Sequence, residues 1–205
     1  MKTVKILLSF LILFSLQLMA TEEPEFTLIH KENNFEIREY PPRFIAQVNV
    51  SGDFDDASSA GFKALANYIF GNNTLVDGSH KIAMTAPVLA EPKLNKIAMT
   101  TPVLAQSVNN DWLITFVMPK EYTLKNLPKP NNSEVKILEL PVEKYAVVVF
   151  SGLVRESSYN EKAALLNEFV ISNQLNTDGP IMIARYNPPW TLPFFRRNEL
   201  MIKVR

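Results

Sequence analysis

The sequence predicts an α+β fold, in which duplicated strand-strand-helix-strand halves form a distorted, largely antiparallel β-barrel flanked by two long helices. Three observations predict it: an internal repeat at an offset of 100 residues, two stretches with helical spacing of apolar residues, and about eight short stretches typical of strands. Strands and helices in this order favour separate β and α layers over alternating βαβ units.

The internal repeat divides the chain into two similar halves. Residues 35–67 and 135–167 are identical at 11 of 33 positions when they are aligned without gaps, whereas average residue usage gives roughly two identities by chance. We therefore expect one domain, residues 21–205, built from two pseudo-repeats at about residues 26–119 and 133–205.

The first half begins with two predicted strands, Phe35–Tyr40 and Phe44–Val50, which are separated by a break at Pro41-Pro42. Ser51-Gly52-Asp53 predicts a turn. A helix follows that ends near Gly71-Asn72-Asn73. Apolar residues share one stripe of this helix, at Phe62, Leu65, Ala66 and Ile69.

The second half repeats this order after a strand at Trp112–Met118. Ser158-Tyr159-Asn160-Glu161 has the capping-box pattern, which predicts that a helix begins at Ser158. Leu166, Phe169 and Val170 then follow at helical spacing. Two further strands are predicted at Ile181–Tyr186 and Glu199–Val204.

A tandem decapeptide stands between the two helices. Lys81–Ala90 recurs as Lys96–Ala105 with nine of ten positions identical. In extended segments, Met84 and Met99 would lie on the same face as the neighbouring Ile and Val residues. One interpretation is a β-hairpin whose methionines fill the core. The other is part of a ligand-binding wall for a flat apolar cofactor.

The N-terminus and the composition limit the classes of function. Residues 1–20 resemble a secretory signal peptide, with Lys2 and Lys5 before an apolar stretch and Leu18-Met19-Ala20 as a cleavage site. This predicts a periplasmic or secreted protein with no stable membrane span after cleavage, and an uncleaved anchor is the alternative. The rest of the chain carries 19 basic and 21 acidic residues, which argues against nucleic-acid binding. The absence of Cys excludes disulfides, thiol catalysis and lipoprotein acylation.

Catalytic and metal-binding motifs are scarce. The only histidines, His30 and His80, are 50 residues apart and outside any zinc-binding pattern. The chain has neither a nucleophile elbow nor a glycine-rich phosphate loop. We therefore expect a binding protein and not an enzyme.

Several separated motifs, in order along the chain, resemble the SOUL haem-binding protein family. They are Phe35–Tyr40, Lys81–Val88, Phe116–Leu124, Leu127–Asn131, Tyr186–Pro189 and Arg196–Glu199. The resemblance covers about residues 26–205. It implies a duplicated α+β fold and non-covalent binding of haem or a related porphyrin, in proteins that are carriers more than enzymes.

One position departs from the family pattern. Some members have a histidine in the strand E-I-R-x-Y as a proposed iron ligand, but Glu39 stands there in this chain. A carboxylate is a poorer haem ligand than imidazole. The resemblance therefore implies binding in an apolar groove with a basic rim and without a strong axial ligand.

The resemblance also indicates candidate cofactor-binding residues. They are Lys63, Asn67 and Phe70 of the first helix, Trp190, Phe194 and Phe195 of a loop near the C-terminus, the propionate partners Arg196 and Arg197, and the thioethers Met84 and Met99. For several of them a structural role is the alternative. In this alternative, Phe70 belongs to the core, the loop aromatics pack on the barrel, and the two arginines are solvated or bound to Glu199.

Three functions remain open from the sequence. The first is an exported haem or tetrapyrrole carrier or buffer. The second is a SOUL-fold module that has lost haem and binds another apolar ligand or a protein partner. The third is a tetrapyrrole-modifying enzyme that uses Glu39 or His80 as its acid or base.

Overall fold

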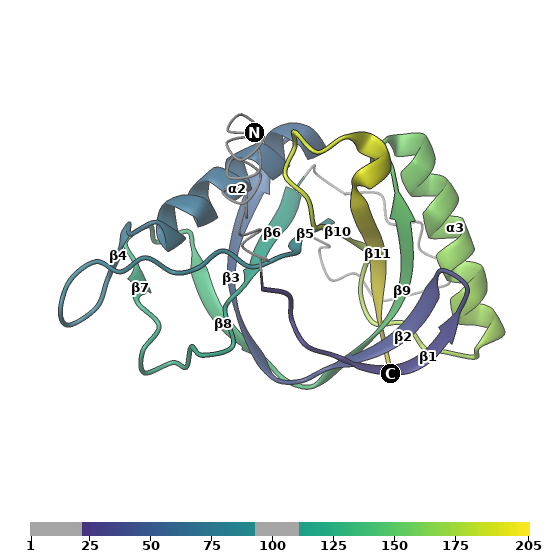
Figure 1. The fold of residues 1–205 in the computed structure, drawn as a ribbon, viewed down its shortest axis with the longest axis horizontal. Coiled ribbons are helices and arrows are strands. Elements are labelled where there is room, and N and C mark those ends of the chain that lie inside the picture. The colour runs from purple at the N-terminus through teal and green to yellow at the C-terminus, as the bar shows by residue number, and fades with distance from the viewer. Residues whose placement is uncertain (1–21, 93–110) are drawn as a thin grey trace, which may run out of the picture.

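A computed structural model describes residues 22–92 and 111–205 of the chain. In these residues nine strands form one antiparallel sheet that curls into a half-barrel (Figure 1). The order across the sheet is β1 (Thr27–Glu32), β2 (Phe35–Tyr40), β9 (Glu143–Ser151), β11 (Arg197–Val204), β10 (Met182–Arg185), β5 (Val88–Pro92), β6 (Asp111–Val117), β3 (Arg43–Ser51) and β8 (Lys136–Leu140).

The sheet corrects one part of the predicted fold. A closed barrel would join its first and last strands, but in the described residues β1 and β8 are free edges. The sheet is therefore an open half-barrel. The predicted signal peptide, residues 1–20, and the second decapeptide copy with Met99 lie outside the described residues.

The strand order is symmetric about the contact between β10 and β5. Outward from this contact, β10, β11, β9 and β2 on one side match β5, β6, β3 and β8 on the other. The offset of 100 residues pairs β2 with β8 and β3 with β9. This symmetry is what a duplicated chain predicts, and the duplication itself stays a prediction.

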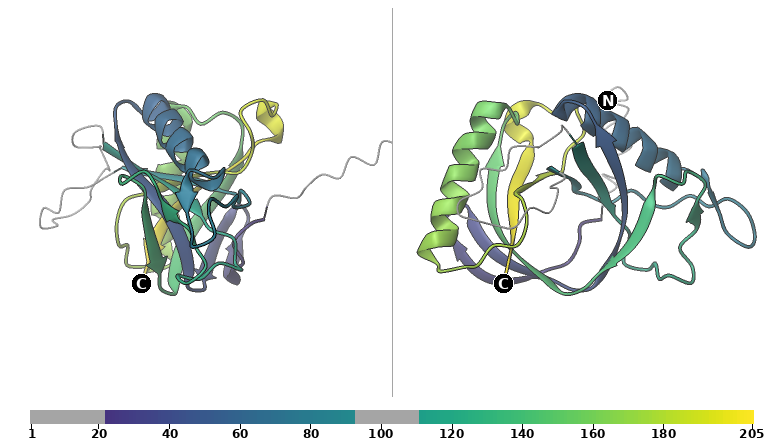
Figure 2. Two further views of the ribbon diagram at one scale, coloured as in Figure 1. Left: turned by 90° about the vertical axis from the view of Figure 1, so that its left-hand side faces the viewer. Right: turned by 180° about the vertical axis from the view of Figure 1, so that it is seen from behind.

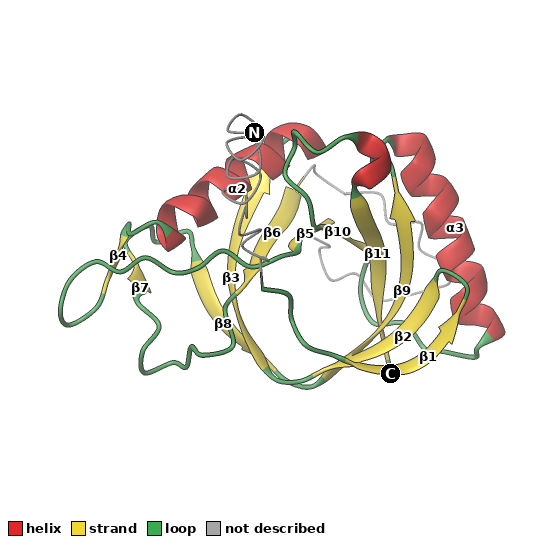
Figure 3. Ribbon diagram, viewed as in Figure 1, coloured by secondary structure: helices red, strands yellow, loops and turns green. Residues whose placement is uncertain are grey.

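Two long helices cover the convex side of the half-barrel (Figure 3). Helix α2 (Phe54–Ile69) lies on β3 and β6, and helix α3 (Glu156–Ser172) lies on β9 and β11. The side chain of Asp53 caps α2 by accepting hydrogen bonds from the backbone N–H groups of Asp55 and Asp56. A short 3₁₀ helix, η1 (Pro193–Phe195), precedes β11.

The start of α3 differs from the prediction. The helix begins at Glu156, with Arg155 as its N-cap residue, and Ser158 is therefore at the third helical position. Its hydroxyl accepts a hydrogen bond from the backbone N–H of Arg155. Ser158 thus accepts this hydrogen bond from within the first turn of the helix. The prediction of a helix beginning at Ser158 was wrong.

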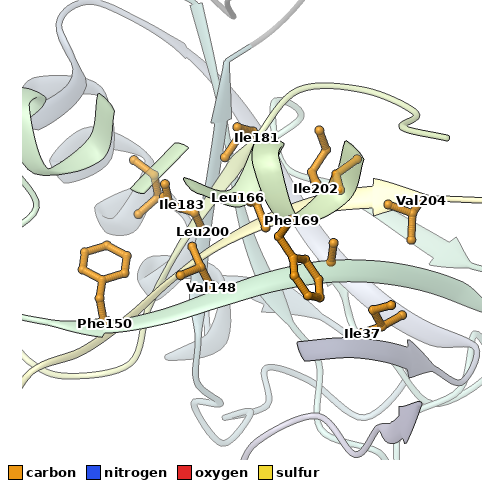
Figure 4. Packing of buried hydrophobic residues seen from close by; sticks show 12 residues of the cluster. Ile37, Val148, Phe150, Leu166, Phe169, Ile181, Ile183, Leu200, Ile202 and Val204 are labelled. Atoms are coloured by element: carbon orange, nitrogen blue, oxygen red, sulfur yellow. The ribbon is translucent and has the colours of Figure 1, made fainter. Parts of the chain in front are cut away.

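Each helix covers an apolar cluster on the convex side. Beneath α3, residues from five elements interlock around Phe169 and Leu166 (Figure 4). Beneath α2, the cluster includes Leu65, Tyr68 and Ile69 of the helix. This packing accounts for the predicted helical stripes.

The first decapeptide copy contributes to the cluster beneath α2. Only its last residues are in a strand, because β5 begins at Val88. Ile82 is buried, and Met84 is half-buried against the same apolar cluster. The predicted strand over the whole copy is wrong, while Met84 lies where the core interpretation places it.

A short two-stranded sheet, β4 (Asn73–Thr74) with β7 (Lys129–Pro130), lies beyond the C-terminal end of α2. The buried side chain of Asn73 holds this region, because it donates to the carbonyls of Tyr68 and His80 and accepts from the backbone N–H of His80. Among the described residues, no helix is both long and apolar enough to cross a bilayer.

Gly61 allows the close contact between α2 and the sheet. A Cβ atom built at Gly61 would lie 2.6 Å from Cβ of Ile114 on β6. In an exposed helix, replacing Gly by Ala stabilises by about 1 kcal/mol, but overpacking a core costs about 1–3 kcal/mol. We expect Gly61→Ala to lower the free energy of unfolding in urea by about 1–2 kcal/mol. Ser59→Ala, at an exposed position of α2, should change it by less than about 0.5 kcal/mol. A stabilised Gly61→Ala protein would show that the helix does not sit this close to the sheet.

Candidate functional site

The most exposed aromatic side chains lie together on the loop between β10 and β11. Trp190 is 82% exposed, Phe194 is 66% exposed and Phe195 is 69% exposed. The loop stands out from the body of the protein, as the side view in Figure 2 shows. We call residues 187–196 the aromatic loop. The alternative that these aromatics pack onto the sheet is wrong.

Backbone contacts give the aromatic loop a defined shape. The guanidinium of Arg196 donates to the carbonyls of Thr191, at 2.8 Å from Nε, and of Pro189. The carbonyl of Pro193 accepts hydrogen bonds from the backbone N–H groups of Gly152 and Arg196, each at 3.0 Å. Arg196 thus positions the loop through Nε and Nη2 of its guanidinium.

Arg197 lies at the base of the loop, on the concave side of the sheet. Its guanidinium carbon is 3.9 Å from the centre of the Tyr186 ring. Nη2 is 2.7 Å from the carboxylate of Glu199, and Nη1 is 3.0 Å from the carboxylate of Glu23. The alternative that Arg197 binds Glu199 is therefore confirmed.

Glu199 belongs to a buried ionic cluster. Its side chain is fully buried, and Arg38, only 1% exposed, binds it in a bidentate manner at 2.8 and 3.0 Å. Arg38 also donates to Glu36 at 2.6 Å. The hydroxyl of Tyr186 donates to Glu199 at 2.8 Å, and burial and the nearby Glu199 charge raise the pKa of Tyr186. Every charge in the cluster is therefore paired.

The predicted helix residues share one stripe of α2. Lys63, Asn67 and Phe70 follow at i, i+4 and i+7, and all three are exposed, so Phe70 is not a core residue. Arg185, at the end of β10, stacks on Phe54 at the start of α2, with its guanidinium carbon 4.6 Å from the ring centre. Phe70 lies 16 residues beyond Phe54, or about 24 Å along the helix. The stripe of Lys63, Asn67 and Phe70 thus lies beyond Phe54, toward the C-terminal end of α2.

The remaining candidate acids, bases and metal ligands are elsewhere. Glu39 lies 3.8 Å from the amine of Lys144, His30 stacks on Phe169 of α3, and His80 hydrogen-bonds Asp77 in a turn. In residues 22–92 and 111–205, no group of three or more metal-ligating side chains comes together.

The concave face has two small cavities. One, of about 140 Å³, lies between residues 22–25 and the rim formed by β3 and the end of β6, and the other, of about 20 Å³, lies beneath Pro24. Pockets that enclose drug-sized ligands measure about 300–1,000 Å³. Each of these two cavities is smaller than that range.

Comparison with known proteins adds the family. The model of the SOUL heme-binding protein family matches residues 21–203. The chain belongs to the SOUL heme-binding protein family. No curated protein matches it.

Solved structures support the fold of this SOUL protein. The C-terminal domain of EcmrR is 11% identical over 83% of this chain and 96% of that chain, with a TM-score of 0.61. A hydrolase from Listeria innocua is 14% identical over 86% of this chain and 94% of that one, with a TM-score of 0.56. At such identities the likeness concerns the fold alone.

Sequence analysis missed two residues that surround Arg197. Glu23 stands in a short acidic stretch whose charges gave no indication of a partner in β11. Arg38 belongs to the quoted motif E-I-R-x-Y, and alternation along β2 places Glu36, Arg38 and Tyr40 on one face. That pattern could have indicated a buried arginine, but its partner Glu199 is 161 residues away.

The carboxyl of Glu91, on β5, makes the free energy of unfolding depend on pH. Burial and the nearby charge of Glu143 raise its pKa to about 7, against the effect of Lys203. Between about pH 4.5 and 7 the folded protein holds a proton that the unfolded chain lacks, so the free energy of unfolding falls as the pH rises through this window. We expect Glu91→Gln to remove this fall and to stabilise the protein above pH 7 by on the order of 2–3 kcal/mol.

Urea unfolding at pH 5 and pH 8 measures this difference. Glu139→Gln, which changes an exposed carboxyl on β8, should follow the wild-type pH dependence. If the free energy of unfolding falls equally for wild type and Glu91→Gln between the two pH values, Glu91 is not held in an environment that disfavours its charge.

Proposed function

We propose that this protein binds haem, or a related tetrapyrrole, non-covalently on the aromatic loop. It would act as a carrier or buffer outside the cytoplasm, in the periplasm or after secretion. Three observations support the proposal: membership of the SOUL family, the exposed aromatic loop, and the predicted signal peptide at residues 1–20.

The exposure of Trp190, Phe194 and Phe195 on one shaped loop is the observation that carries this proposal. Exposed apolar groups that gather in one place mark binding surfaces. A flat macrocycle can stack on such rings, and burial of an aromatic side chain contributes about 1.5–3 kcal/mol. Because Arg196 already orders the loop, little conformational entropy is lost when the ligand binds.

The charged rim fits the propionates of a haem. Arg197 follows the loop directly, and its guanidinium can pair with a propionate. The segment from Asn187 to Arg197 contains no His, Cys, Met or Tyr, so it offers haem iron none of the usual axial ligands. The bound group would supply a flat apolar surface and two carboxylates. Binding without an axial ligand favours exchange, which suits a carrier.

The alternatives have weaker support. A tetrapyrrole-modifying enzyme needs an acid or base beside the ligand, and both candidates, Glu39 and His80, face other partners away from the aromatic loop. A module that binds another apolar ligand or a protein would use the same exposed aromatics, and a haemin titration separates it from the haem carrier.

We expect saturable one-to-one binding of haemin to residues 21–205 at micromolar or tighter levels. The measurement is quenching of tryptophan fluorescence in a Trp112→Phe background, in which Trp190 is the remaining tryptophan. In that background Phe194→Ala should weaken binding about tenfold, since each aromatic contributes by burial.

Leu124→Ala serves as the matched control, because Leu124 is 65% exposed on another loop. This variant should bind haemin as the parent protein does. Equal affinity of the Phe194→Ala variant would move the site away from the loop. Absent or non-saturable binding by the parent would remove the haem assignment and leave the second function.

A further inference from the structure

The N-terminal segment spans the open side of the half-barrel. We call residues 22–26 the strap, and Figure 1 shows the chain crossing in front of the sheet before β1. The carbonyl of Glu22 accepts a hydrogen bond from the backbone N–H of Ala86 at 2.9 Å. Glu23 binds Arg197 at 3.0 Å, and Glu25 binds Lys120 at 2.7 Å. The strap is therefore held by backbone pairing and by two separate ion pairs.

The ring of Phe26 completes these contacts. It lies 5.5 Å from the ring of Tyr40, and the guanidinium carbon of Arg38 is 4.4 Å from its centre. The strap thus connects, within five residues, the base of the aromatic loop to the buried ionic cluster.

Arg197 has one permanent partner and one exchangeable partner. Glu199 is fully buried, and Arg197 binds it through Nε at 3.1 Å and Nη2 at 2.7 Å. Glu23 binds the third nitrogen, Nη1, and its side chain is 45% exposed. Exposed ion pairs contribute little and exchange readily. Nη1 is therefore the position at which another carboxylate can replace Glu23.

This position lies close to the surface proposed for the tetrapyrrole. Phe194 and Phe195 precede Arg197 by three and two residues, which is at most about 11 Å of chain. We propose that Glu23 competes with the ligand for Arg197, an inference that rests on the proposed function. A propionate of the bound tetrapyrrole takes the place of the Glu23 carboxylate on Nη1 of Arg197, and the strap is released there.

The proposal separates two kinds of effect that the strap can have. Glu23 and Glu25 carry the same charge and are two residues apart, but Glu25 binds Lys120 and not Arg197. Removal of either charge lowers the repulsion of an anionic ligand equally. Only removal of the Glu23 charge frees Arg197, so Glu25→Gln is the matched control.

Haemin titration of residues 21–205 and of four variants tests the proposal. Glu23→Gln should tighten binding about two- to fivefold, the range that loss of an exposed ion pair allows. Glu25→Gln should match wild type. Arg197→Ala should weaken binding, and Glu23→Gln should have no effect in the Arg197→Ala background. Hydrogen exchange of the strap amides in the wild type should become faster when haemin binds.

The outcomes distinguish this proposal from the proposed function. If the wild type binds haemin but Glu23→Gln leaves the affinity unchanged, haem binding stands and the competition is refuted. Equal tightening in Glu23→Gln and Glu25→Gln would also refute it, because the cause would then be net charge. If the wild type does not bind haemin, both proposals fail. Thermal unfolding of each variant checks that the substitution has not unfolded the protein.

Discussion

The buried pairing of Arg38 with Glu199 is the interaction on which the arrangement of the site depends. It crosses β9, which lies between β2 and β11, and joins these two strands that are far apart in the sequence. Removing one partner of such a pair leaves an unpaired buried charge, which costs about 3–5 kcal/mol. Because Glu199 also binds Arg197 and Tyr186, the same carboxylate fixes both sides of the aromatic-loop base.

This fixed base explains how exposed aromatic side chains are maintained on a short loop. Trp190, Phe194 and Phe195 remain exposed to solvent. The loop keeps its shape because the Arg196 guanidinium donates to a loop carbonyl and the carbonyl of Pro193 accepts backbone hydrogen bonds. The base of the aromatic loop is thus held in a fixed conformation, and its tip presents the exposed apolar side chains. The exposed rings at the tip form the surface on which we propose that the tetrapyrrole binds.

Local patterns in the sequence were sufficient for most of the fold. Strands such as Phe35–Tyr40, both helices and the antiparallel character follow from periodicity and turn residues. Closure of the sheet could not be predicted, because pairing of the edge strands is a long-range property. The helix start at Glu156 was missed because Ser158 has the same hydroxyl whether it precedes the helix or lies within its first turn.

The candidate site residues remain a prediction, and the structure adds the partners that some of them have. The aromatic and basic residues around the loop were named from the family resemblance. The structure shows that Arg196 holds backbone carbonyls and that Arg197 is bound by Glu199 and Glu23. Glu199 was one of the alternatives named from the sequence, whereas the partner Glu23 has no signal near Arg197 in the sequence. Contacts that join residues more than 150 positions apart depend on the complete fold.

The most direct test of this account is an NMR spectrum of ¹⁵N-labelled residues 21–205 with and without ferric haemin. Paramagnetic iron broadens the signals of nearby amides. We predict loss of signals in the aromatic loop and at Arg197, with α3 unaffected. Broadening centred on α3 or on the concave strands, with the loop signals unchanged, would contradict it.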